Sequence, residues 1–373
     1  MKAKSLRSHA LFVLVGLLLV FGAPSMLSDF RLSLLAKYLC FAILAIGVDL
    51  SWGYGGMLAL GQGVFFGLGG YCMGMYLKLK SAGPGALPDF MTWSGVDELP
   101  ALWKPFRYAW FALPMAVLLP AFVAWMLGSL IFRQRVRGAY FAILTQALAV
   151  AFVTLLVGQQ GLTGGTNGLT NVRELLGLNL RDSGDRHVLY LIVVGILGVV
   201  FLIARQLVRS RFGRLLVAVR DGEDRVRFLG YDPAKVKTSA FAISAGMAGL
   251  AGALFVPVVG IISPALLGVV PSIEMVIWVA VGGRATIYGA ALGAVVVNWA
   301  KTNLSERYPS GWLYFQGALF VIVMMFAPRG LAGIRTTASA TVAHLRARFD
   351  WRDRAPGATA GGSEVIDRAE VVA

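Results

Sequence analysis

Residues 188–237 read VLYLIVVGILGVVFLIARQLVRSRFGRLLVAVRDGEDRVRFLGYDPAKVK. The first part, 188–207, is apolar almost throughout, and a run of about 20 apolar residues crosses a bilayer as a helix. The second part, Arg205–Lys237, carries nine Lys/Arg and four Asp/Glu. An apolar span that opens into a long charged loop predicts a membrane protein with a structured segment on the membrane surface.

Apolar runs of this kind recur along the whole chain. Of its 373 residues, 57% are hydrophobic and only 14% are charged, which excludes a water-soluble globular protein. Backbone groups in lipid must bond within their own segment, so helices are the economical way to cross. The alternation typical of a membrane β-barrel is absent from the sequence. We predict an all-α polytopic membrane protein with about ten transmembrane helices, near residues 10–27, 32–52, 57–77, 109–131, 139–158, 188–207, 238–259, 272–283, 285–300 and 312–327.

Basic side chains are distributed unevenly between the predicted loops. If the N-terminus lies in the cytoplasm, the cytoplasmic segments hold 23 of the 34 Lys/Arg, whereas the acidic residues divide nine to eight. A bias in bases without a bias in acids follows the positive-inside rule. The net charge of +15 therefore orients the helices and does not indicate nucleic-acid binding.

The same rule decides how many spans lie near the C-terminus. Residues 274–300 could form one long helix or two short ones broken at Gly282-Gly283-Arg284. One helix would leave the arginine-rich C-terminus outside, so we predict two helices and place both termini in the cytoplasm.

A single membrane domain is therefore expected over residues 1–335. It includes a cytoplasmic loop at 205–237 and two outer insertions at 78–108 and 159–187. The tail, 336–373, lacks apolar periodicity beyond a short stretch and is expected to be cytoplasmic and largely disordered.

The charged loop is long enough to form a helix, a turn and a second helix. Within residues 222–230, Val226 and Leu229 lie beside Phe228 at helical spacing among charged residues. Such a short amphipathic helix suits a socket in a soluble partner. The residues predicted to contact that partner are Glu223, Asp224, Arg225, Phe228, Leu229 and Gly230.

Glycine and acidic residues in the second span suggest an interrupted helix. Gly53, Gly55 and Gly56 surround Tyr54, and such a cluster either packs helices tightly or breaks the helix where a solute passes. Asp49 lies four residues before Gly53 and is expected to cap the amides of the broken helix, with a solute contact as the alternative. Glu274 follows Pro271 and is expected to stabilise the N-terminal end of its helix.

Several kinds of chemistry are absent from the sequence. It contains no Gly-Lys pair, so it has no phosphate-binding loop and no ATPase activity of its own. Its three histidines are scattered and lie outside the spans, which excludes a histidine-based metal site. Cys40 and Cys72 lie in or beside apolar spans and indicate neither a disulfide nor a metal. We predict no enzyme activity and no cofactor.

Six sequence blocks together resemble one family. The longest, GYGGMLALGQGVFFG at 53–67, is similar to the family pattern G-Y-x-G-x-x-S-L-G-H-x-x-F-F-G, with Ala59 in place of Ser and Gln62 in place of His. The others are LTGGTNGL at 162–169, 213–220 with Leu229-Gly230, the small-residue run at 241–254, 272–274 and Gly282-Gly283. The family is that of the membrane permeases of ABC importers for branched-chain amino acids and related small solutes.

Within that family, four runs look most like the urea-importing type: 70–77, 88–103, 312–320 and 328–333. The resemblance implies a urea path through the plasma (inner) membrane; a branched-chain amino acid path is the alternative, and a passive small-solute channel is a third reading. It also implies a second, homologous permease, two cytosolic ATPases and a soluble solute-binding protein outside. A path for a small neutral solute needs uncharged polar groups, for which the candidates are Tyr54, Gln62, Tyr71, Thr145 and Gln146. A side chain of this kind in a membrane span more often forms a bond between helices than a contact with the solute.

Overall fold

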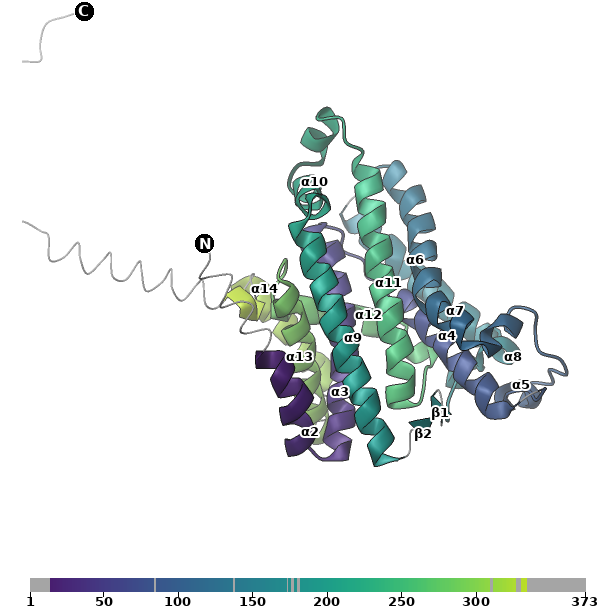
Figure 1. Ribbon diagram of the computed structural model, residues 1–373. Coiled ribbons are helices and arrows are strands. Elements are labelled where there is room, and N and C mark those ends of the chain that lie inside the picture. Colours follow the sequence, from purple (N-terminus) through teal and green to yellow (C-terminus); the bar gives the residue numbers. More distant parts are fainter. Residues whose placement is uncertain are drawn as a thin grey trace, which may run out of the picture. The chain divides into compact units, whose positions relative to one another are not determined.

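The computed structural model describes residues 14–83, 85–136, 138–172, 174–175, 178–179, 182–308, 311–326 and 330–333. Helices dominate these residues, as predicted (Figure 1). The longer elements are α3 (Asp29–Asp49), α4 (Gln62–Ala82), α6 (Ala109–Arg133), α7 (Ala139–Gly158), α9 (Ser183–Arg209), α10 (Arg211–Phe228), α11 (Pro233–Val259), α12 (Val269–Gly282), α13 (Ile287–Arg307) and α14 (Trp312–Phe326).

Shorter elements join these helices. They are the π-helical turns η1 (Leu18–Gly22) and η2 (Leu50–Tyr54), the 3-10 turns η3 (Lys104–Arg107), η4 (Gly165–Asn167) and η5 (Pro264–Leu266), and the short helices α2 (Ala23–Met26), α5 (Asp89–Trp93) and α8 (Gln160–Thr163). An antiparallel pair of two-residue strands, β1 (Glu174–Leu175) and β2 (Leu178–Asn179), lies in the second predicted outer insertion. The sequence did not predict this pair.

Six of the helical segments are long and apolar enough to cross a membrane: Asp29–Tyr54, Ala109–Arg133, Ala139–Gly158, Ser183–Arg209, Pro233–Val259 and Pro264–Gly282. This confirms a multi-pass membrane protein. Helices α4 and α13 occupy two further predicted spans but are less apolar, and the apolar helices at Leu14–Met26 and Tyr314–Val323 are shorter. The total of about ten spans and the cytoplasmic position of both termini stay predictions. The predicted tail, 336–373, lies outside the described residues.

Several predicted boundaries shift for local reasons. The span predicted at 57–77 begins only at Gln62, because the chain leaves the helix at Gly55 and turns through Gly56, whose φ is +71°. The predicted loop is shorter than 205–237: α9 continues to Arg209, and α11 begins at Pro233, where the Asp232 side chain caps the amide of Ala234.

The predicted break between α12 and α13 is confirmed. Helix α12 ends at Gly282, and Gly283 adopts φ +117°, a conformation that favours glycine. Helix α13 then begins at Ile287.

Helix α11 lies at the centre of the bundle, packed against α3, α4 and α6 (Figure 1). Glycines allow these close approaches. A Cβ on Gly252 would lie 1.9 Å from the carbonyl oxygen of Phe66 on α4, and a Cβ on Gly249 would lie 2.4 Å from that of Ala116 on α6. Packing of small residues is what joins helices in lipid, where the hydrophobic effect does not drive association.

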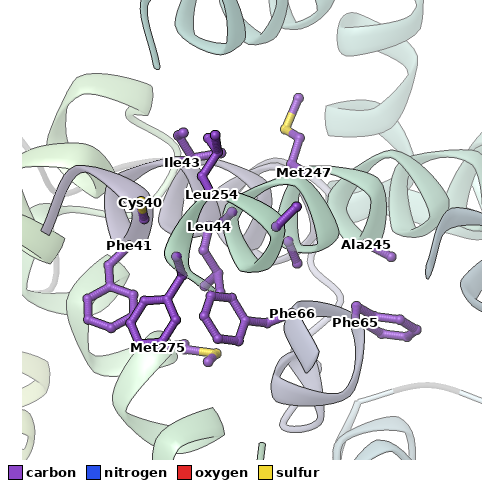
Figure 2. Close-up of a cluster of buried hydrophobic side chains, with 14 of the residues drawn as sticks. Cys40, Phe41, Ile43, Leu44, Phe65, Phe66, Ala245, Met247, Leu254 and Met275 are labelled. Carbon is purple, nitrogen blue, oxygen red and sulfur yellow. The ribbon is translucent and has the colours of Figure 1, made fainter. Parts of the chain in front are cut away.

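Aromatic rings fill the space between four of these helices. The Phe41 ring on α3 lies 4.8 Å from Trp278 on α12 and 5.5 Å from Phe255 on α11, and Phe66 on α4 lies 5.2 Å from Phe255. Figure 2 shows Phe41 and Phe66 within the buried cluster, with Met275 beside them. Offset and edge-on ring pairs of this kind stabilise a core beyond their buried area.

The two predicted outer insertions contact each other. The Trp103 indole of the first insertion donates to the carbonyl oxygen of Leu162 in the second at 3.0 Å. Within the first insertion, Lys78 of α4 pairs with Asp89 of α5 at 3.2 Å. Leu169 also pairs with Ile262, which follows α11. These segments therefore form a folded layer over one end of the bundle.

The topology predicts that two exposed sites face opposite sides of the membrane. In a background with Cys40 and Cys72 replaced, a Thr166→Cys variant should react with an impermeant thiol reagent in intact cells. An Arg225→Cys variant should react only after permeabilisation, because the positive-inside rule places its loop in the cytoplasm. Both positions are exposed. Labelling of Arg225→Cys from outside would contradict the orientation.

Candidate functional site

The candidate site lies where α3 ends inside the bundle. Helix α3 passes into the π-helical turn η2, and residues 56–61 are not helical. Gly53 has no room for a side chain: a Cβ there would lie 1.9 Å from Asp49 Oδ1 and 2.5 Å from the amide nitrogen of Ala285. The turn between α12 and α13 is thus pressed against the end of α3, and the two chain breaks form one centre.

Asp49 joins these two breaks. Its carboxylate is fully buried, and Oδ1 accepts a hydrogen bond of 2.7 Å from the amide of Ala285. We predicted that Asp49 would cap amides of a broken helix. The amide that it binds belongs to the α12–α13 turn and not to the break at Gly53. The guanidinium of Arg284 in the same turn lies 4.3 Å from the centre of the Trp52 ring, within range of a cation–π interaction.

Arg220 on α10 reaches the same centre from the charged loop. Its Nη1 donates to the carbonyl oxygen of Gly53 at 2.7 Å, and its Nε donates to Asp221 Oδ1 at 2.8 Å. The hydrogen bond from Arg220 holds the pKa of the exposed Asp221 carboxyl below its usual value. Sequence reasoning missed Arg220 as a site residue, although it ends the family-like block at 213–220.

A chain of buried polar groups crosses the bundle beside the break. The Ser244 hydroxyl of α11 donates to the carbonyl oxygen of Gly47 at 2.6 Å and accepts from Gln62 Nε2 at 3.2 Å. Ser51 Oγ lies 3.4 Å from the same hydroxyl. Gln62 is fully buried, and its Oε1 has no hydrogen-bond partner among the described residues. The predicted path residue Gln62 therefore retains one free acceptor deep in the bundle.

The other predicted path residues do not all lie together. Thr145 on α7 is buried and accepts from the Leu60 amide at 3.0 Å, so it supports the non-helical segment. Tyr54 ends η2 and is half-buried, and Gln146 is half-buried on α7. Tyr71 lies nine residues after Gln62 on α4, about 14 Å along the axis and on the opposite face. Tyr71 is thus separate from the break.

The predicted partner-binding segment has an exposed apolar tip. Helix α10 kinks at Gly222, where φ is −166° and ψ is 73°. Beyond the kink, Phe228 and Leu229 are 92% and 75% exposed. Val226, which we predicted on the same face, is only 4% exposed and packs inward. The amphipathic helix therefore presents Phe228 and Leu229, and not Val226, to the outside.

Ion pairs fix this second half of α10. Glu223 forms a buried ion pair with Lys237 in the first turns of α11, and its Oε1 lies 3.5 Å from Arg227. The predicted contact residues Asp224 and Arg225 are exposed. Gly230 closes the segment with φ +84°.

Glu274 has a different role from the predicted one. Helix α12 begins at Val269, so Glu274 lies beyond its first turn. Its two carboxylate oxygens each lie 2.7 Å from Lys301 Nζ on α13. It therefore joins α12 to α13 through an ion pair and does not act on the helix dipole.

A pocket of about 240 Å³ lies between α10 and the break. Its walls combine apolar side chains with charged ones: Gly55, Gly56, Met57, Phe132, Val136, Gly138, Phe141, Val219, Arg220, Asp221, Gly222, Glu223 and Lys237. Within the part of the chain that the structure describes, no group of three His, Cys, Asp or Glu side chains could hold a metal ion.

Comparisons with known proteins agree with one family. A model of the family described as "Branched-chain amino acid transport system / permease component" matches residues 30–327. The high-affinity branched-chain amino acid transport system permease proteins LivM of Salmonella typhimurium and Escherichia coli are each 27% identical to the chain over 343 residues, which cover 86% of this chain and 74% of the relative. A probable branched-chain amino acid transport permease protein LivM of Methanocaldococcus jannaschii is 24% identical over 315 residues, which cover 78% of this chain and 90% of the relative. No solved structure matches the chain.

The polar chain beside the break should contribute to stability. A Ser244→Ala substitution removes the donor to Gly47 and the acceptor for Gln62, so we expect a loss of about 1–3 kcal/mol in the free energy of unfolding. Ser239 on the same helix is exposed and bonds only to its own turn. Ser239→Ala should therefore change stability by less than about 0.5 kcal/mol. Unfolding in detergent would measure both, and equal losses would contradict a special role for Ser244.

Proposed function

Because the chain belongs to the branched-chain amino acid transport permease family, we propose that it forms a path for branched-chain amino acids in an ATP-driven importer. The family match covers residues 30–327, which include α3 except for its first residue and all the described helices from α4 to α14. This match is the observation that carries the proposal. The chain is a multi-pass protein of the plasma (inner) membrane. In this reading it is a transport subunit and not an enzyme.

The sequence pointed first to urea, but the relatives support the alternative. All three relatives compared are named as branched-chain amino acid permeases, and urea appears in none of these names. The urea resemblance rested partly on residues 88–103, which lie in the outer layer near α5 and η3. A resemblance in that layer is evidence about the outer surface of the protein, and it says little about the path through the bundle.

The chemistry beside the break is compatible with a zwitterion. Helix α4 begins inside the bundle at Gln62, and the N-terminal end of a helix attracts a carboxylate. Gln62 Oε1 has no hydrogen-bond partner in the part of the chain that the structure describes, so an ammonium group could donate to it. Burying a charge without such compensation is very costly, so a path for amino acids needs groups of both kinds near each other.

We further propose that residues 222–230 contact a cytosolic ATPase. The proposal is supported by the exposure of Phe228 and Leu229. The segment that carries them is joined to α11 by the ion pair between Glu223 and Lys237. Membership of the importer family implies ATPase and binding-protein partners. A second, homologous permease would complete the path.

Uptake measurements distinguish the two solutes. Cells with and without the gene are given labelled leucine or labelled urea at micromolar concentration. We expect deletion to abolish most leucine uptake and to leave urea uptake unchanged, and the restored gene to recover leucine uptake. Loss of urea uptake with leucine uptake intact would reinstate urea as the solute.

The exposed tip of α10 should be required for coupling. Replacing Phe228 and Leu229 together with Asp puts charges where an apolar contact is proposed, so we expect the ATPases to be lost on purification and uptake to fall at least tenfold. Trp93→Asp is the matched control, because Trp93 is also highly exposed but belongs to the predicted outer side. If the double variant retains both the ATPases and uptake, the proposed contact is wrong.

A further inference from the structure

We propose that Arg220 is a positioning residue that ties the cytosolic segment α10 to the helix break, so that displacement of α10 changes the conformation of residues 53–56. The inference rests on the proposed function, because it assumes that an ATPase contacts the exposed tip of α10. The link is one hydrogen bond, from Arg220 to the carbonyl oxygen of Gly53.

The carbonyl of Gly53 has lost its helical partner. In a continued α-helix, the amide of Met57 would bond to Gly53. That amide instead donates to the Ser51 carbonyl at 2.9 Å, because the chain turns at Gly55 and Gly56. The Arg220 guanidinium takes its place with a bond of 2.7 Å. A side chain from another segment thus completes the end of the broken helix.

Helix α10 also contacts the break sterically. A Cβ on Gly56 would lie 2.7 Å from Arg220 Cγ, and a Cβ on Gly55 would lie 3.2 Å from Leu216 Cδ1. Leu216 and Val219 are buried, so this face of α10 is anchored on the bundle. Both the polar and the apolar groups of α10 therefore meet the same four-residue turn.

The link can respond to movement because it is not enclosed. The pocket of about 240 Å³ borders Gly55, Gly56 and Arg220, and the Arg220 side chain is 29% exposed. Gly222, the next residue but one, is the kink of α10. Arg220 therefore lies just before the kink, where a shift of the exposed tip reaches it, and the pocket leaves space for its side chain to move away from Gly53.

The opposite side of the turn is fixed. Asp49 binds the Ala285 amide, and Gly53 lies against the same amide. When Arg220 withdraws, the carbonyl of Gly53 loses this hydrogen bond, which is unfavourable until another donor replaces it. The turn must then repack or admit water. The state of residues 53–56 is therefore coupled to the position of α10.

The experiment uses the complete importer with its ATPases and binding protein, reconstituted in proteoliposomes. Solute uptake and ATP hydrolysis are measured together for wild type, Arg220→Gln and Arg220→Lys. Arg211→Gln is the matched control, an exposed arginine at the other end of α10. Thermal unfolding and subunit stoichiometry are recorded for each.

We expect Arg220→Gln to retain assembly and to hydrolyse ATP within twofold of wild type, while uptake per ATP falls at least tenfold. Arg220→Lys keeps the charge but lacks the planar guanidinium, so it should show an intermediate ratio. Arg211→Gln should match wild type. A wild-type ratio in Arg220→Gln overturns the proposal, as does a parallel loss of uptake, hydrolysis and thermal stability with the ratio unchanged.

If Arg220→Gln does not fold, the ratio of uptake to hydrolysis in Arg220→Lys decides alone, and a wild-type ratio there overturns the proposal. Failure of the proposed function looks different. In that case the wild-type complex itself takes up no leucine, whatever residue stands at position 220.

Discussion

The architecture depends on one constraint: a backbone group inside a membrane bundle must have a hydrogen-bond partner. Uninterrupted helices meet it by themselves, but this chain breaks at 55–61 and at 283–286. Side chains from elsewhere then supply the missing partners. The Asp49 carboxylate accepts from the amide of Ala285, and the Thr145 hydroxyl accepts from the amide of Leu60. The Arg220 guanidinium donates to the carbonyl oxygen of Gly53. The breaks persist because distant segments hold them.

Local pattern predicted the elements well but could not predict these partners. The apolar runs predicted helices, and Gly282-Gly283 predicted the break that separates α12 from α13. Asp49 was predicted to cap an amide, but the amide that it binds, that of Ala285, lies 236 residues away in the sequence. Val226 and Leu229 have helical spacing, but Val226 is 4% exposed and Leu229 is 75% exposed, because α10 ends at Phe228 and Leu229 no longer continues its face. Periodicity assumes a helix that continues, so it fails where a helix ends.

The identity of the solute shows a different limit of sequence reasoning. Short runs such as 70–77 and 88–103 suggested urea, whereas similarity over most of the chain agrees with amino acid permeases. The second run lies in the outer layer, where Lys78 meets Asp89 and Trp103 meets Leu162. Those contacts build a surface and touch none of the groups around Gln62. A solute is selected by the groups it meets, so a resemblance in the surface layer carries little weight.

The placement of charge in the described bundle suggests how the breaks can serve transport. Gln62, Ser244 and Ser51 are neutral, whereas Asp49, Arg220 and Arg284 gather at the end of the break that faces α10. A neutral polar chain can exchange its hydrogen bonds for those of a solute at small cost. A charged group cannot lose its partners so cheaply, because an unpaired charge in a bundle is strongly unfavourable. Asp49, which is fully buried against the Ala285 amide, therefore acts as a fixed point about which the glycine turn changes conformation, whereas Arg220 borders the pocket and is the group that moves with the cytosolic segment.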